Sequence, residues 1–238
     1  DVVINAAAMT NVDACEDDKE GCWKLNVEAV QYLVSACEKY NSHLIHVSTD
    51  FIFDGKSGPY TEESEPNPLS YYGESKLAAE EIVKKSLCKW SIARTVLVYG
   101  VVDNMSRSNI VLWAKGALES GKPLTVVDDQ FRTPTLAEDL AHGCILIAQK
   151  QAEGVYNITG DDYMCIIDLV KKVAQYYQLD ENLVKAISSS SLNQKAARPP
   201  KTHLLLDKAK RELGYNPSSF EEGLSILDVQ IYARQHEE

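Results

Sequence analysis

Tyr72 and Lys76 stand four positions apart in the run Tyr72-Gly73-Glu74-Ser75-Lys76. In a helix, such residues lie on one face about one turn apart, so both side chains can point into the same cleft. There the ammonium group favours the phenolate, and we expect it to lower the pKa of the tyrosine from its usual ~10. A tyrosine so placed can donate a proton to a carbonyl oxygen as a general acid. The same pattern also fits an ordinary helix start, with a packed tyrosine and a solvated lysine.

The bulk composition indicates an ordinary globular protein. The chain has 238 residues, enough for one large α/β domain with or without a smaller appendage. Its net charge of −11 and pI near 5.0 disfavour nucleic acid and anionic membranes as partners. The six cysteines are scattered without a C-x-x-C pair, so we expect reduced thiols, no zinc or other metal site and a cytoplasmic location. We find no signal peptide and no apolar stretch long enough to span a membrane.

Apolar runs alternate with stretches of helical periodicity. The predicted strands cover residues 1–8, 43–48, 91–98, 123–127 and 155–159, and the predicted helices cover 24–40, 71–86, 108–120, 136–150 and 165–177. This alternation predicts an α/β fold with a Rossmann-like, doubly wound, mostly parallel sheet. The first strand reads as buried on both faces, and since the chain opens inside it, we expect further N-terminal strands ahead of Asp1 in the natural protein.

Polar residues follow the predicted strand 43–48 at Thr49 and Asp50, where open α/β sheets place their ligands. His43 and His46 are three positions apart in this strand and point to opposite faces, so we expect both to be structural rather than joint metal ligands. Asn26 is either a helix cap or a side chain that holds a backbone group or water near a ligand. Residues 51–68 are predicted to form a surface loop.

Four motifs together resemble the extended short-chain dehydrogenase/reductase family. They are Asn26, Ser48-Thr49-Asp50, Tyr72-Gly73-Glu74-Ser75-Lys76 and Arg94-Thr95-Val96-Leu97-Val98-Tyr99-Gly100, in matching order and spacing. Residues 48–55 and 129–135 are most similar to the sugar-nucleotide reductases of that family. The resemblance covers essentially the whole chain. It implies a dinucleotide-binding Rossmann domain over residues 1–150, to which 151–160 return, and a smaller C-terminal α/β substrate-binding region over 161–238, with a contribution from 101–135.

The resemblance also implies roles for individual residues. Tyr72 becomes the general acid, Lys76 its pKa modulator and a ligand of the nicotinamide ribose, and Thr49 a hydrogen-bonding partner of the substrate ketone. The implied cofactor is NADPH, with NADH as an alternative. The implied cofactor-binding residues are Ala6, Ala7, Ala8, Asn26, Ser48, Tyr72, Lys76, Thr95, Val96 and Leu97, and the implied substrate-binding residues are Thr10, Thr49, Asp50, Gln130, Arg132 and Arg198.

Two departures from the family pattern limit what the resemblance implies. No G-x-x-G-x-x-G occurs, so we expect the chain as it stands to lack the cradle for the cofactor diphosphate and to bind NADPH poorly. Leu97 stands where the family's reductases often carry tryptophan, which leaves the exact sugar open.

Three other functions compete with reduction. A sugar-nucleotide dehydratase is disfavoured because Phe51, not a glutamate, follows Asp50. An NAD-dependent 4-epimerase stays open, as does a non-catalytic regulatory subunit that binds a partner enzyme. The sequence is compatible with a homodimer and leaves the oligomeric state undecided.

Overall fold

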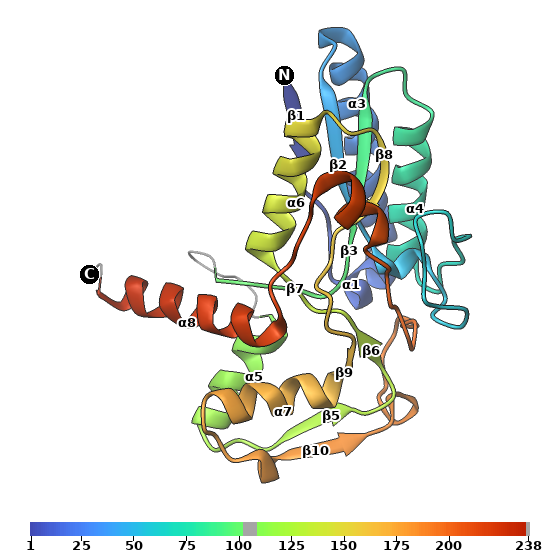
Figure 1. The fold of residues 1–238 in the computed structure, drawn as a ribbon. Helices are drawn as coiled ribbons and strands as arrows, with labels where there is room; N and C mark the ends of the chain where they lie inside the picture. Colours follow the sequence, from blue (N-terminus) through green and yellow to red (C-terminus); the bar gives the residue numbers. More distant parts are fainter. Residues whose placement is uncertain (102–108, 237–238) are drawn as a thin grey trace.

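The computed structural model describes residues 1–101 and 109–236. Its centre is a four-stranded parallel sheet in the order β1-β2-β3-β8. The strands are β1 (Val2–Asn5), β2 (His43–Thr49), β3 (Trp90–Thr95) and β8 (Gly154–Asn157). In Figure 1 the strands run from the end that carries the N-terminus toward the region that contains α7, β5 and β10. The carboxyl ends of the strands therefore face this second region.

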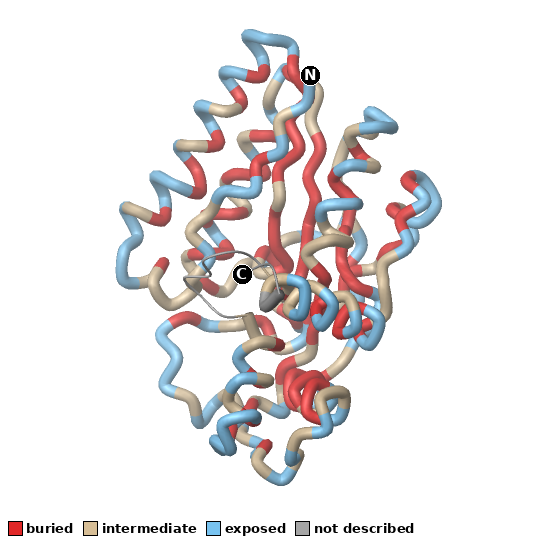
Figure 2. The backbone as a smooth tube through the Cα atoms, turned by 90° about the vertical axis from the view of Figure 1, so that its left-hand side faces the viewer, coloured by how far each residue is buried: buried red, intermediate tan, exposed pale blue. Residues whose placement is uncertain are grey.

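Helices cover both faces of the sheet, as the alternating pattern predicts. On one face, α3 (Ala29–Tyr40) and α4 (Tyr71–Lys84) pack against Leu44 and Ile92. On the other face, α6 (Ala137–Lys150) packs against Ile45. Figure 2 shows the central strands buried along most of their length and the covering helices exposed along one side. The doubly wound α/β fold is thus confirmed.

The first strand differs from its prediction. It covers only Val2–Asn5 instead of residues 1–8, and Val2 and Ile4 are 42% and 46% exposed. The reason is that β1 is the edge strand of the sheet in the described chain, so the face that carries these two side chains has no covering layer. The expectation of a strand buried on both faces is therefore wrong for this chain.

The helix predicted over residues 24–40 begins earlier than expected. A continuous helical run is formed by α2 (Lys19–Trp23), a π-helical turn (Lys24–Glu28) and α3. The Asp18 carboxylate starts this run by accepting a hydrogen bond from the Gly21 N–H. A further short helix, α1 (Val12–Asp17), was not predicted because one and a half turns give no apolar stripe.

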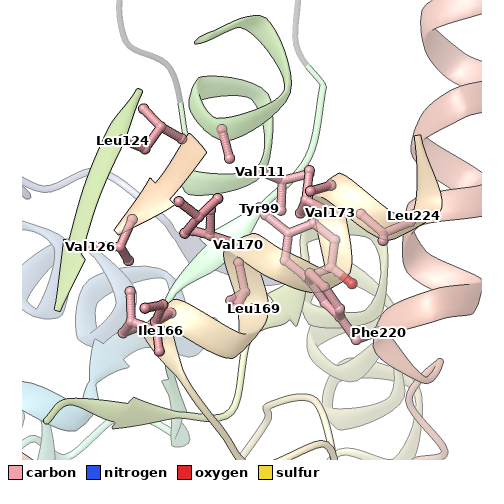
Figure 3. Packing of buried hydrophobic residues seen from close by; sticks show 14 of the residues in the cluster. Tyr99, Val111, Leu124, Val126, Ile166, Leu169, Val170, Val173, Phe220 and Leu224 are labelled. Atoms are coloured by element: carbon pink, nitrogen blue, oxygen red, sulfur yellow. The ribbon is translucent and has the colours of Figure 1, made fainter. Parts of the chain in front are cut away.

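A second hydrophobic core lies beyond the carboxyl ends of the sheet. Here β5 (Leu124–Val127) pairs in parallel with β10 (Val184–Ile187), and both pack with α5 (Ile110–Glu119), α7 (Ile166–Tyr176) and α8 (Phe220–His236). Figure 3 shows Val170 and Val173 of α7 at the centre of this cluster. The helix expected from about residue 108 is α5, and its predicted start lies outside the described residues.

Short strand pairs connect the two cores. Strand β4 (Val98–Tyr99) pairs with β7 (Thr135–Leu136), and β6 (Phe131–Arg132) pairs with β9 (Met164–Cys165). The predicted strand 91–98 therefore stops at Thr95, and the chain changes direction at Leu97, whose φ is +40°. No helix among residues 1–101 and 109–236 combines the length and apolarity needed to cross a membrane. All six cysteines are free and buried.

Candidate active site

A cavity of about 560 Å³ opens where the carboxyl ends of β2 and β3 meet the second core. Its position follows from the parallel sheet, because strands of one direction deliver their terminal residues to a single edge. The lining residues are Ala6, Ala8, Thr10, Val12, Val47, Ser48, Thr49, Asp50, Phe51, Tyr72, Lys76, Thr95, Leu97, Val98, Ile110, Gln130, Arg132, Leu140, Ile166 and Arg198. The cavity thus brings together most of the residues singled out by the sequence. The exceptions are Ala7, Asn26 and Val96.

Tyr72 reaches the cavity from the first turn of α4. The Ser70 hydroxyl caps this helix by accepting a hydrogen bond from the Gly73 N–H at 3.3 Å. Gly73 allows the helix to approach the turn after β2 closely, since a Cβ atom there would lie 2.3 Å from the Phe51 carbonyl oxygen. The Tyr72 ring also packs edge-on against the ring of Phe51, with centroids 5.7 Å apart. These contacts fix the phenol in a buried position.

Thr49 lies at the end of β2 beside this phenol. Its Oγ1 accepts a hydrogen bond from the Phe51 N–H at 3.2 Å and donates to Asp50 Oδ1 at 3.2 Å. Burial raises the pKa of Tyr72 well above its usual value, and a hydrogen bond with Thr49 opposes the shift. A hydroxyl and a phenol therefore converge on one part of the cavity, and both can donate hydrogen bonds to a single oxygen atom once the Thr49 O–H turns from Asp50 toward it.

Lys76 is buried in the same cavity, but its amine is held by β2. Its Nζ donates to the Val47 carbonyl oxygen at 2.7 Å and lies 3.2 Å from His46 Nε2. Burial lowers the pKa of Lys76 to about 8. The expectation that this lysine lowers the pKa of Tyr72 is wrong for the chain alone, because burial of the phenol dominates and raises that pKa.

Thr95 lines the cavity beside Ala6, Ala8, Ser48 and Leu97. Its Oγ1 is buried and has no hydrogen-bond partner within the described chain. Such an atom is costly unless a ligand satisfies it. The small side chains of Ala6 and Ala8 leave room for a ligand at the backbone. These features fit a planar amide-bearing group such as a nicotinamide.

Asn26 and Val96 do not reach the cavity. Asn26 lies within the π-helical turn and is not a cap. Its side chain accepts from the Met9 N–H at 2.7 Å and donates to the Met9 carbonyl at 3.1 Å. It therefore holds the backbone of the segment after β1 in place, as its second predicted role requires, and the proximity of this contact to a ligand stays a prediction. The Val96 side chain packs with Ile52 and Phe53 in a separate cluster and does not line the cavity.

Asp50 and Arg132, which also line the cavity, form a buried ion pair with Arg132 Nε 3.6 Å from Asp50 Oδ2. Arg132 also donates to the carbonyl oxygens of Pro199 and Pro200, while Thr202 donates to Asp50. Burial raises the pKa of Asp50, against the opposing charge of Arg132. Both side chains thus clamp residues 199–202 onto the sheet and form part of the wall.

Comparison with known proteins decides the family. The family model described as "RmlD substrate binding domain" matches residues 1–230. The chain belongs to this family. The dTDP-4-dehydrorhamnose reductase of Aggregatibacter actinomycetemcomitans is 34% identical over 244 residues, which cover 98% of this chain and 81% of that protein. The reductase branch of the short-chain dehydrogenase/reductase family, which the motifs indicate, is thereby confirmed.

Two further relatives of this RmlD-family chain bear on its function. The crystal structure of dTDP-4-dehydrorhamnose reductase from Bacillus anthracis, in complex with NADP, superposes with a TM-score of 0.88 at 27% identity. The match covers 96% of this chain and 80% of that one. Methionine adenosyltransferase 2 subunit beta from Xenopus tropicalis is 29% identical over 89% of this chain and 64% of that protein.

Two kinds of residue in the RmlD-family site carry no signal in the sequence alone. The apolar lining, which includes Val12, Ile110, Leu140 and Ile166, comes from helices and carries no local signal. His46 was interpreted as structural, yet it contacts Lys76 directly. Strand alternation places a side chain on a face but does not say which residue of a covering helix it meets.

Proposed function

We propose that the protein reduces a 4-keto sugar nucleotide with NADPH, converting dTDP-4-dehydro-6-deoxy-L-mannose to dTDP-L-rhamnose. The observation that carries this proposal is the convergence of Thr49, Tyr72 and Lys76 in one cavity. The relatives named for this reaction, one of them holding NADP, support it.

In this reaction Tyr72 donates its proton to the ketone oxygen while Thr49 donates a hydrogen bond to the same oxygen. Both groups stabilise the negative charge that develops there. The dihydronicotinamide of NADPH supplies the hydride to the ketone carbon. Thr95 and the small residues Ala6 and Ala8 are the groups of this chain that would hold the nicotinamide, with Lys76 on its ribose. The apolar lining excludes water from the reacting oxygen.

We also propose that the two parts of the chain built around the two cores bind different ligands. Residues 1–160 hold the cofactor, and residues 161–238, with a contribution from 101–135, hold the sugar nucleotide. Arg198 is the side chain of this chain that would neutralise the substrate diphosphate, and Thr10 and Gln130 line the same cavity. Residues 102–108 of the contributing segment lie outside the described residues.

The test is NADPH oxidation followed by absorbance with dTDP-4-dehydro-6-deoxy-L-mannose as the probe. We expect Tyr72→Phe to lower kcat by about 100-fold or more, since it removes a general acid. Tyr71→Phe is the matched control: it changes the adjacent tyrosine, which packs against Trp23 and lies outside the cavity. Unchanged kcat in Tyr72→Phe contradicts the assigned mechanism.

A second candidate function is that of a regulatory subunit, favoured by the likeness to methionine adenosyltransferase 2 subunit beta. Absence of turnover together with a co-purifying partner enzyme would establish it. An epimerase differs from a reductase by releasing no oxidised cofactor during turnover, so the stoichiometry of NADPH consumption separates reduction from epimerisation.

A further inference from the structure

His46 links the edge strand of the sheet to the lysine of the candidate active site. It is fully buried in the middle of β2, where it pairs in register with Asn5 at the end of β1. Its Nδ1 lies 3.1 Å from Asn5 Nδ2, and its Nε2 lies 3.2 Å from Lys76 Nζ. Both ring nitrogens are therefore engaged, one on each side.

The backbone near Asn5 fixes the direction of these contacts. Asn5 Oδ1 accepts a hydrogen bond from the Ala7 N–H at 3.2 Å, so the amide nitrogen of Asn5 must face His46. An amide nitrogen is only a donor, and His46 Nδ1 therefore accepts. Burial keeps the pKa of His46 well below its usual value, so the ring is neutral. Its one proton then sits on Nε2 and points at Lys76.

An N–H directed at Lys76 has a consequence for its charge. A neutral amine can accept from His46 Nε2 and donate to the Val47 carbonyl, whereas an ammonium group has only donors and would face the imidazole N–H unfavourably. We propose that His46, held by Asn5 as the Nε2–H tautomer, is a positioning residue that donates a hydrogen bond to Lys76 and makes the neutral amine accessible near physiological pH. The catalytic consequence rests on the proposed function, whereas the tautomer of His46 and the charge of Lys76 are independent of it.

Two other groups near Lys76 also affect its pKa. Glu80, one turn further along α4, and Cys22 of α2 both raise its pKa, against the effect of burial. Glu80 is itself bound by Arg94 through two hydrogen bonds, at 3.0 and 2.8 Å, and its own pKa is lowered. These groups remain in place when His46 is changed, so a change at His46 isolates its contribution.

The first experiment reads the tautomer by NMR in protein with isotope-labelled histidine. We expect the His46 signal to show a protonated Nε2 and an unprotonated Nδ1. It is assigned by its disappearance in His46→Gln. A proton on Nδ1 instead overturns the proposal; the protonation state is read in the unmodified protein, and His46→Gln serves only to assign the signal.

The second experiment titrates Lys76 by NMR in protein with isotope-labelled lysine. In His46→Gln the side-chain amide can turn its oxygen toward Lys76 and accept from the ammonium group. We expect the pKa of Lys76 to rise by about one unit, because one charge-assisted hydrogen bond is gained. His43→Gln is the matched control, since His43 is a buried histidine of the same strand that contacts Ser91 at 2.8 Å and not the cavity.

Both variants are then compared in turnover. If the proposed function is correct, the alkaline limb of the kcat/KM profile reports the loss of the Lys76 proton. We expect this limb to shift to higher pH in His46→Gln and to stay in place in His43→Gln. An unchanged Lys76 titration in folded His46→Gln overturns the proposal. A shifted titration with no turnover in any form of the protein leaves the His46 assignment standing and contradicts the reductase function instead.

Discussion

Arg198 and Asp13 are 185 positions apart, and the Arg198 guanidinium donates to the two oxygens of the Asp13 carboxylate at 3.2 and 2.7 Å. The hydrogen bond with Arg198 is the main cause that lowers the pKa of Asp13. The pair joins the segment before Pro199 to helix α1 at the wall of the cavity. Asp13 therefore binds the same Arg198 guanidinium group that we assign to the substrate diphosphate.

This competition gives the first prediction. Asp13→Asn removes the competing charge, and we expect it to lower the KM for the sugar nucleotide by roughly fivefold, since a partly exposed ion pair is worth about 1 kcal/mol. Arg198→Gln should raise the same KM by about tenfold and change kcat little. Steady-state kinetics measure both. Lys195→Gln is the control, because Lys195 makes an exposed ion pair with Asp17 on the same helix. Equal KM values for Asp13→Asn and Arg198→Gln would refute the assignment.

The buried Lys76 predicts a dependence of stability on pH. Its pKa falls from 10.5 to about 8 on folding, so between these values the unfolded state binds more protons. The cost of burying the charge is thus present below pH 8 and disappears as the pH rises toward 10.5. Lys76→Met removes this cost. We expect its stability advantage over the unmodified protein to shrink by roughly 3 kcal/mol between pH 7 and 10.5, as measured by urea unfolding. A difference that stays constant with pH would show that Lys76 is not desolvated.

Gly73 and Gly116 both lie inside helices and should respond oppositely to alanine. A Cβ at Gly73 would lie 2.3 Å from the Phe51 carbonyl oxygen, while one at Gly116 would meet nothing within 4 Å. We expect Gly73→Ala to cost about 1–3 kcal/mol and to lower kcat, because α4 and Tyr72 must move away from Thr49. Gly116→Ala should stabilise the protein by up to about 1 kcal/mol at unchanged kcat. Thermal unfolding and turnover of the two variants check this pair. The close approach of α4 would be disproved by an activity of Gly73→Ala equal to that of Gly116→Ala.

The ion pair between Glu80 and Arg94 is buried, with side chains 0% and 2% exposed. Removing one partner leaves a buried charge, so we expect Glu80→Leu to cost about 3–5 kcal/mol. Combining it with Arg94→Met should recover most of that loss, because an apolar pair needs no solvation. Urea unfolding provides the free energies. As a control, Lys115→Gln breaks the more exposed pair with Glu119 and should cost less than about 1 kcal/mol. Additive losses in the double variant would contradict the coupling.

Patterns along the chain predicted the parts of the fold that depend on neighbouring residues. Apolar periodicity located α4, α6 and the central strands, and the polar residues after β2 located Thr49 in the cavity. The exposure of Val2 and Ile4 was missed because an apolar run does not say how many strands flank it. A single sequence carries no information on that number.

The electrostatics of the site depended on contacts in space that spacing could not predict. Tyr72 and Lys76 are one turn apart, which suggested that the ammonium group lowers the pKa of the phenol. The amine instead binds the Val47 carbonyl, and burial raises the pKa of Tyr72. The contact with His46 was missed for the same reason, since it joins a strand to a helix 30 positions away.

The clamp between Asp50 and Thr202 closes a loop of 152 positions, and Arg132 joins its two sides. We expect a contact of such separation to form late, because the entropy of closing a long loop must be overcome first. The cavity wall is therefore complete only after the segment around residue 202 has left the ribosome and docked. Ligand binding during refolding should accordingly lag behind the recovery of helix, which makes the cavity a reporter of the last step of folding.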